Sequence, residues 1–190
     1  GSNGSNPLNF VSFNGKLYFT ANDNTYGQEL WVSDGTSSGT VILKDIYSGS
    51  TSSNPANFTV VGTSLFFTAT TSSGTELWKT DGTASGTAMV KDIQSGTGSS
   101  NPTKLIDAGG TLYFVATTTT YGTEVWKSDG TSAGTVLVSD LFPGSGGYGV
   151  DAIAYMNGYV YISEDAGTYG TELYITDGTS AGTVLLKNIN

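Results

Sequence analysis

The side chains in this sequence that are best suited to chemistry are carboxylates that recur in pairs. A glutamate is followed sixteen residues later by an aspartate in three places, and in a fourth place Glu172 is followed by Asn188. Calcium and other hard cations prefer clustered carboxylate oxygens, so each acidic pair is a candidate cation site, and we expect no other cofactor. The pairs are Glu29 with Asp45, Glu76 with Asp92, and Glu124 with Asp140.

Two further carboxylates, Asp107 and Asp151, stand apart because they lie in or beside an expected inner strand and are not repeated. Positioned carboxylates can transfer protons during catalysis, so these two are the candidates for a hydrolase or lyase site. The chain contains no histidine, cysteine or arginine, which excludes a Ser-His-Asp triad, thiolate chemistry and most zinc sites. We therefore expect a protein that is not an enzyme, and a carboxylate-based enzyme is the alternative.

The paired carboxylates belong to a unit that is repeated four times. The segment ELWVSDGTSSGTVILKDI, which starts at Glu29, returns with small changes at Glu76, Glu124 and Glu172, at intervals of 47, 48 and 48 residues. A fixed period of this length is the signature of a repeat architecture. The chain therefore divides into four units of a single array, approximately 1–48, 49–95, 96–143 and 144–190.

Each unit contains four short runs with the composition of β-strands. An apolar run, Phe10–Phe13 in the first unit, is followed by a glycine-bearing turn and a second run, LYFTA at Leu17. Asn-Gly between apolar runs indicates a hairpin, and a continuous apolar run is typical of a strand buried on both faces. A polar loop precedes the third run, and the DGTxxGT segment leads to the fourth. The pattern predicts an all-β protein, a β-propeller built from four four-stranded antiparallel blades. A sandwich would not require the same residues in every unit.

The copies ELWVSDGT, ELWKTDGT, EVWKSDGT and ELYITDGT resemble the ELWxxDGT repeat family and, more distantly, the TolB-like propeller repeats. The resemblance covers the whole chain. It implies a secreted or surface-anchored bacterial protein, located outside the cell, and says little about activity. The fourth copy departs from the pattern, because Tyr174 replaces tryptophan and Tyr148-Gly149-Val150 replaces the Ser-Asn-Pro element of the other units.

Two sets of repeated residues are interpreted as structural. A large ring two residues after each glutamate is expected to fill the wedge between blades, and a ligand cage is the weaker interpretation. These rings are Trp31, Trp78, Trp126 and Tyr174. The aspartate of each DGT sequence is expected to form a turn, because Asp bonds its own downstream backbone and Gly accepts a positive φ. These aspartates are Asp34, Asp81, Asp129 and Asp177.

The repeated glutamate should face either a lysine or an aspartate across the hairpin of the third and fourth strands, depending on the register. A glutamate opposite lysine forms an ion pair, whereas a glutamate opposite aspartate needs a cation or a water between them. Ion pairing is the favoured interpretation, calcium binding is the alternative, and Ser139 leaves Glu124 without a partner. The ion pairs would be Glu29–Lys44, Glu76–Lys91 and Glu172–Lys187.

The loops between the second and third strands and between successive blades carry the candidate ligand-binding residues. In a propeller both sets of loops emerge on one face, and function concentrates in loops that a rigid scaffold holds. Tyrosine with asparagine can stack on and hydrogen-bond a sugar ring, although ordinary loop packing explains the same residues. The candidates are Tyr26, Tyr121, Tyr169, Asn6, Asn54 and Asn101.

The overall composition limits the partners. Charged residues make up only 12% of the chain, the net charge is -9, and the seven lysines are dispersed. Phosphate binding needs clustered cations, so we expect no nucleic acid as partner. No apolar run approaches the roughly 18 residues of a membrane helix, so we expect no membrane insertion.

We expect a non-enzymatic binding or scaffolding module whose ligand is a glycan or a protein. The alternatives are a hydrolase or lyase with carboxylates at the central channel, and a purely structural module. A ring has no free edges, so three assemblies are considered: a self-closed four-bladed monomer, a head-to-tail dimer that forms an eight-bladed ring, and a piece of a longer array. Self-closure ranks first, narrowly.

Overall fold

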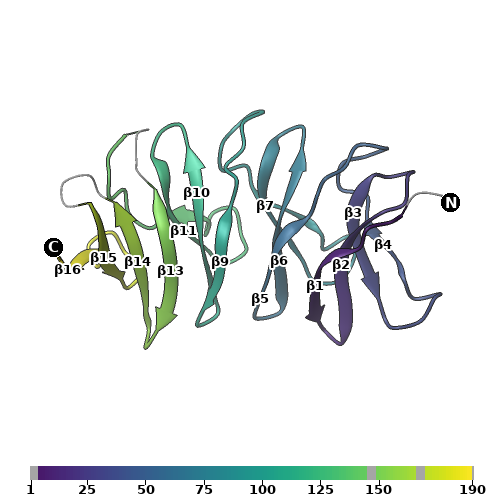
Figure 1. Ribbon diagram of the computed structural model, residues 1–190, viewed down its shortest axis with the longest axis horizontal. Coiled ribbons are helices and arrows are strands. Elements are labelled where there is room, and N and C mark those ends of the chain that lie inside the picture. The colour runs from purple at the N-terminus through teal and green to yellow at the C-terminus, as the bar shows by residue number, and fades with distance from the viewer. Residues whose placement is uncertain (1–3, 145–148, 166–169, 190) are drawn as a thin grey trace. The chain divides into compact units, whose positions relative to one another are not determined.

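The structure, a computed structural model, describes residues 4–144, 149–165 and 170–189. Every regular element in these ranges is a β-strand, and the strands form four four-stranded antiparallel sheets (Figure 1). Each sheet corresponds to one sequence repeat and has its strands in chain order, as in a propeller blade. The predicted fold class, an all-β β-propeller of four-stranded blades, is confirmed. The described residues contain no helix that could cross a membrane.

The blades are numbered here in chain order. The first blade contains β1 (Leu8–Phe13), β2 (Lys16–Asn22), β3 (Gln28–Ser33) and β4 (Val41–Lys44). The second contains β5 (Ala56–Val61), β6 (Ser64–Thr71), β7 (Gly74–Thr80) and β8 (Ala88–Lys91). The third contains β9 (Thr103–Ala108), β10 (Thr111–Thr118), β11 (Gly122–Ser128) and β12 (Val136–Leu137). The fourth contains β13 (Val150–Met156), β14 (Tyr159–Asp165), β15 (Thr171–Thr176) and β16 (Val184–Lys187).

The chain forms two compact units, Gly1–Gly98 with the first two blades and Ser99–Asn190 with the last two. Each unit has an apolar core of its own between its two blades. Because residues along a strand point alternately to the two sides of a sheet, one set of side chains on each blade faces the core of its unit and the other set points away from that core.

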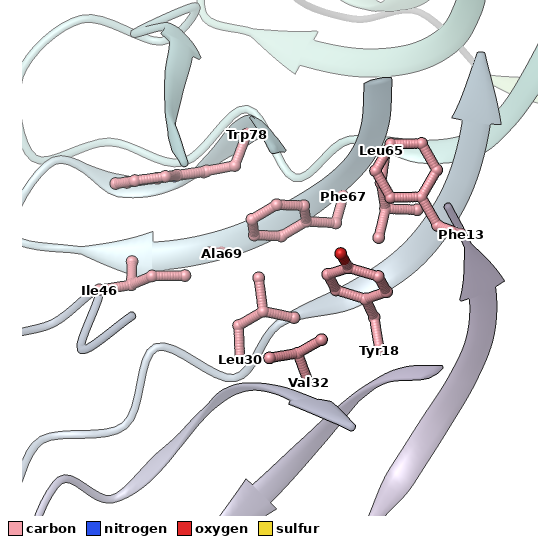
Figure 2. Packing of buried hydrophobic residues seen from close by; sticks show 9 residues of the cluster. All are labelled: Phe13, Tyr18, Leu30, Val32, Ile46, Leu65, Phe67, Ala69 and Trp78. Atoms are coloured by element: carbon pink, nitrogen blue, oxygen red, sulfur yellow. The ribbon is translucent and has the colours of Figure 1, made fainter. Parts of the chain in front are cut away.

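The core of the first unit lies between the first and second blades. Tyr18, Leu30 and Val32 point from the first blade toward Leu65 and Phe67 of the second (Figure 2). All five side chains are at most 6% exposed, and each buried side chain of this size contributes roughly 1.5–3 kcal/mol. The cluster is completed by Phe13, Ile46, Ala69 and Trp78.

The core of the second unit repeats this arrangement between the third and fourth blades. Tyr113 and Val125 on the third blade pack against Val160, Ile162 and Tyr174 on the fourth. Tyr174 therefore takes the place in this unit that Trp78 has in the first, against the blade before it.

The first strand of each of the first three blades contains a β-bulge near its start. The residue in the bulge has a left-handed backbone, with φ of 57° at Asn9, 57° at Asn57 and 53° at Lys104. Asparagine tolerates this conformation well, whereas a long side chain such as lysine does so at a cost. Asn9 also donates from Nδ2 to the carbonyl oxygen of Pro55 at 3.2 Å, which joins the inner edges of the first two blades.

Candidate functional site

The repeated glutamate is buried in every blade, and in the first blade it joins that blade to the start of the second. Glu29 is completely buried, and its carboxylate accepts hydrogen bonds from the backbone N–H of Ile46 at 2.9 Å and of Ser53 at 2.9 Å. The hydroxyl of Ser53 donates a third at 2.5 Å. Burial raises the pKa of Glu29, and these hydrogen bonds oppose the rise. Glu76 and Glu172 accept the equivalent bonds from Ile93 N and Ile189 N, each at 3.0 Å.

The predicted Glu–Lys ion pairs are wrong, and the cause is a β-bulge in the outer hairpin. Trp31 pairs with Ile42 but Leu30 pairs with Lys44, so Leu43 is an extra residue that moves the lysine to the side opposite Glu29. Lys91 and Lys187 are likewise paired with leucines, Leu77 and Leu173.

The candidate calcium sites have no set of ligands around them within the described ranges. Two oxygens of Glu29 already accept N–H and O–H donors, which a cation would have to displace. Asp45 Oδ2 accepts a bond from Gly49 N at 3.1 Å, and Asp92 Oδ2 from Gly96 N at 3.2 Å. No group of three acidic side chains there could hold a metal ion, so calcium binding at the Glu–Asp pairs, with Asp140 the third aspartate, stays a prediction.

Each DGT aspartate forms a turn with a fixed set of partners. In the first blade Asp34 Oδ1 accepts bonds from Thr36 N at 2.9 Å and Thr36 Oγ1 at 2.7 Å, and these bonds lower the pKa of Asp34. The same carboxylate lies against Gly39, where any side chain would collide with it. Asp81, Asp129 and Asp177 repeat the arrangement.

The structure gives the candidate loop asparagines a backbone role. Asn6, Asn54 and Asn101 have φ of 43°, 50° and 46°, a left-handed conformation that favours asparagine, and all three are exposed. Their predicted part in ligand binding stays a prediction.

The candidate tyrosines lie in exposed loops. Tyr26 and Tyr121 are each 38% exposed, and Tyr121 packs edge-on against Trp126 at 6.5 Å. In the first unit the loop of Tyr26 is joined to that of Asn54, because Asn54 N donates to the carbonyl oxygen of Gln28 at 3.1 Å. Tyr169 lies outside the described residues. A ligand-binding role for this group stays a prediction.

The two unrepeated aspartates are exposed rather than enclosed in a cleft. Asp107 Oδ1 accepts a bond from Gly110 N at 2.7 Å, so this carboxylate forms the turn between β9 and β10. Asp151 lies at the bulge of β13.

The first blade has an uncovered apolar surface, which we call the first-blade face and define as Phe10, Leu17, Phe19 and Trp31. Phe10 is 58% and Leu17 39% exposed, and Phe19 stacks on Trp31 with ring centroids 6.5 Å apart. In the second blade the equivalent Leu65, Phe67 and Trp78 are buried. The face borders a hollow of about 600 Å³, whose polar lining includes Ser5, Asn22, Asp23, Asn24 and Thr40.

The fourth blade has an exposed counterpart on its opposite side. We call it the last-blade face and define it as Met156, Tyr161, Leu173, Ile175 and Ile189. Met156 is 53% and Ile189 69% exposed, and the other three are partly buried. The equivalent residues of the first blade are 8% exposed or less, because the second blade covers them; they are Phe13, Tyr18, Leu30, Val32 and Ile46.

A pair of buried glutamates distinguishes the second unit. Glu164 stands where the first three blades have alanine, as the register of Ala21 with Glu29 and of Glu164 with Glu172 shows. Glu164 is 1% exposed and shares a hydrogen bond with the buried Glu124. Burial, together with the charge of the other glutamate, raises the pKa of Glu164 to about 8, and burial raises that of Glu124 to about 7. One proton is therefore held between the two carboxyl groups near neutral pH.

Three buried oxygens around this pair accept no hydrogen bond: Glu164 Oε2, Glu172 Oε1 and Asp140 Oδ1. Sequence reasoning missed Glu164 and both apolar faces. The replacement of alanine by Glu164 in the LYFTA run was visible, but nothing in the sequence indicated that this side chain would meet Glu124.

No protein-family model matches the chain, and a search of curated proteins finds no match. Solved structures do match. The computationally designed Ika8 protein has a TM-score of 0.50 and 14% identity over 96% of this chain and 49% of its own. The acylaminoacyl peptidase of Pyrococcus horikoshii has a TM-score of 0.56 and 14% identity over 95% of this chain and 27% of its own.

An α-L-arabinofuranosidase from Clostridium thermocellum also matches, with a TM-score of 0.40 and 16% identity over 94% of this chain and 70% of its own. That score is too low to carry an argument. This chain spans about half the length of the designed protein and about a quarter of the peptidase. At these identities the likeness extends to the fold alone.

Proposed function

We propose that this chain is a non-enzymatic binding and scaffolding module, and that the first-blade face is the surface with which it binds a protein partner. One observation carries the proposal. The first blade exposes the residues that the second blade buries against its neighbour. An exposed cluster of large apolar side chains with a polar rim is typical of a protein interaction site.

The chemistry of the face favours a protein over a glycan. Phe10, Phe19 and Trp31 are rings of the kind that anchor protein interfaces, and the first two are 5.7 Å apart. The partner that fits is a flat apolar surface, such as the side of a β-sheet. The hollow of about 600 Å³ beside the rings gives room for side chains that project from such a surface.

The carboxylates support a non-enzymatic function. Asp107 is engaged in a hairpin turn, and the Glu124–Glu164 pair is 1% exposed or less, so a substrate would not reach it. An origin outside a bacterial cell is part of the proposal as well, on the basis of the repeat resemblance alone.

The test uses the apolar dye ANS, which binds accessible hydrophobic surface. The purified chain, diluted until it is monomeric, should bind the dye, and Phe10→Asp should remove most of the signal. Val41→Asp is the matched control: Val41 is 47% exposed, and its pairing with Val32 places it on the opposite side of the same blade. Near-ultraviolet circular dichroism checks that both variants keep the native fold. Equal dye binding by the wild type and Phe10→Asp would rule out this face as the binding surface.

A further inference from the structure

We propose that the first-blade face binds the last-blade face of a second copy of this chain, head to tail, with the contacts that join successive blades within the chain. This inference rests on the proposed function and names its partner. The junction between the first and second blades shows which contacts such an interface would contain.

Three kinds of contact make up that junction. Glu29 of the first blade accepts hydrogen bonds from the N–H and hydroxyl of Ser53, at the start of the second. Lys44 Nζ donates to the carbonyl oxygen of Thr87 at 2.7 Å, in the DGT loop of the second blade. The apolar core lies between these polar contacts (Figure 2).

The fourth blade carries the equivalents of the residues that the first blade contributes to this junction. Glu172 is 3% exposed, and its Oε2 accepts a bond from Ile189 N at 3.0 Å, as Glu29 does from Ile46 N. Its Oε1, however, is buried and has no hydrogen-bond partner. Leaving a buried carboxylate oxygen unsatisfied is costly, so a donor supplied by a second copy would stabilise this atom. In the first unit Glu29 Oε1 accepts a bond from Ser53 N at 2.9 Å, in addition to one from Tyr47 N at 3.4 Å, and Ser53 comes from the following blade.

The first blade carries the equivalents of the residues that the second blade contributes to this junction. Ser5 is the equivalent of Ser53, and the structure places it the same way: Asn22 N donates to Ser5 O at 2.8 Å, as Thr70 N does to Ser53 O. Ser5 is exposed and lies beside the hollow of the first-blade face. Its N–H and hydroxyl are therefore positioned to donate hydrogen bonds to the carboxylate of a glutamate on a preceding blade.

The residues of the lysine contact are also present, the lysine on the fourth blade and the threonine on the first. Lys187 is the equivalent of Lys44 and is exposed at the end of β16. Thr40, the equivalent of Thr87, is exposed at the rim of the hollow on the first blade. A second copy that docks its last blade there brings Lys187 to the Thr40 carbonyl and Glu172 to Ser5 in one movement, while the two apolar faces cover each other.

The known junction spans the two blades from the inner strands to the outer strands. Asn9 Nδ2 donates to the Pro55 carbonyl at 3.2 Å on the inner strands, and Lys44 Nζ donates to the Thr87 carbonyl at 2.7 Å on the outer ones. A second copy that docks in the same way would therefore cover the exposed apolar residues of both faces.

The experiment measures the solution mass of the full chain by light scattering over a concentration series. The wild type should have twice the mass of one chain, and both Phe10→Asp and Ile189→Asp should be monomers, because each disables one face. Mixing the two variants should restore a dimer, since one chain keeps its first-blade face and the other its last-blade face. Val41→Asp should remain a dimer, and Ser5→Ala should raise the dissociation constant about tenfold or more, because it removes a hydrogen bond to a charged group.

The outcomes separate this inference from the proposed function. A chain that stays monomeric at every concentration and binds ANS would overturn the second-copy assignment and leave the binding module in place. A monomer that binds no ANS would overturn both, because its own fold then covers the face. Masses above the dimer that vanish in Phe10→Asp would still support head-to-tail binding, with a junction that repeats instead of closing. A dimer that survives both Phe10→Asp and Ile189→Asp would refute the proposed faces.

Discussion

The proton held between Glu124 and Glu164 should make the stability of this protein fall as the pH rises. A carboxyl group whose pKa is higher in the folded than in the unfolded state contributes stability below its unfolded pKa. That stability is lost as the pH rises through the folded pKa. The ordinary pKa of both groups is 4.5, and in the folded protein the pKa is raised to about 7 for Glu124 and to about 8 for Glu164. The loss therefore develops between roughly pH 4.5 and pH 8, and it is complete above that range.

The size of the effect follows from the shift of Glu164. A change of one pKa unit corresponds to about 1.4 kcal/mol, so the rise from 4.5 to about 8 gives an upper bound of about 5 kcal/mol. The two carboxyl groups share one proton and titrate as a pair, so the shift of Glu124 is not added to it. Asp140 also lies close to the pair, and its negative charge acts in the same direction.

The perturbation is Glu164→Gln, which keeps the shape and the hydrogen-bonding capacity of the side chain but cannot ionise. The variant should be more stable than the wild type at pH 9 by several kcal/mol, and close to it at pH 5. Glu164→Ala, which restores the residue of the other three blades, should flatten the pH dependence as well. Asp107→Asn is the control, because Asp107 is exposed and keeps its turn-forming oxygen as asparagine.

The assay is urea unfolding at pH 5, 7 and 9, with the infrared band of protonated carboxyl groups as a direct readout. A band that is present at pH 6 in the wild type and missing in Glu164→Gln would locate the proton. Parallel stability curves for the wild type and Glu164→Gln over the whole pH range would show that no proton is held between the two glutamates. A calcium-dependent gain in stability at pH 9, lost in Glu164→Gln, would show instead that the pair holds a cation.

Three further predictions concern the repeated turns and junctions, all measured by urea unfolding at pH 7. Gly86→Ala should destabilise the protein by about 1–3 kcal/mol, because the new methyl group meets the Asp81 carboxylate, and adding Asp81→Ala should recover part of the loss; equal destabilisation in both backgrounds would contradict this. Lys104→Asn should stabilise by about 0.5–1 kcal/mol, since asparagine fits φ of 53° better, and no gain would argue against backbone strain. Ser53→Ala should cost about 1–3 kcal/mol by removing a donor from buried Glu29, and a neutral result would mean that the hydroxyl is not needed there.

The period of the sequence was enough to predict the blades, because four alternating runs per repeat have few arrangements that bury their apolar sides. The Asn-Gly turn after Phe13 shows the same reliability at short range: Asn14 and Gly15 have φ of 49° and 72°, as a two-residue hairpin loop requires. Such a turn depends only on the residues within it, so the local sequence is enough to predict it.

The position of Lys44 could not be predicted in the same way. A single extra residue, Leu43, reverses the side of the sheet to which the lysine points, and no residue type in the segment ILKDI identifies the bulge. The partner of Glu29 is a serine 24 residues away, beyond the reach of strand patterns. The exposed first-blade face could not be predicted for another reason. The repeat predicts which residues form an interface between blades, but it does not say which blade leaves those residues exposed.

The bond from Glu29 to Ser53 has a practical consequence for anyone who wishes to lengthen, shorten or permute this protein. The buried carboxylate belongs to one repeat and its donor to the next, so a cut in the connecting segment 47–52 splits an energetic unit even though it respects the boundary of the sequence motif. New termini would do less damage at the tip of an inner hairpin, such as between Asn14 and Gly15, where both residues are exposed. Repeat units for modular assembly should therefore run from one inner hairpin tip to the next, so that each unit contains both a glutamate and the serine that donates hydrogen bonds to it.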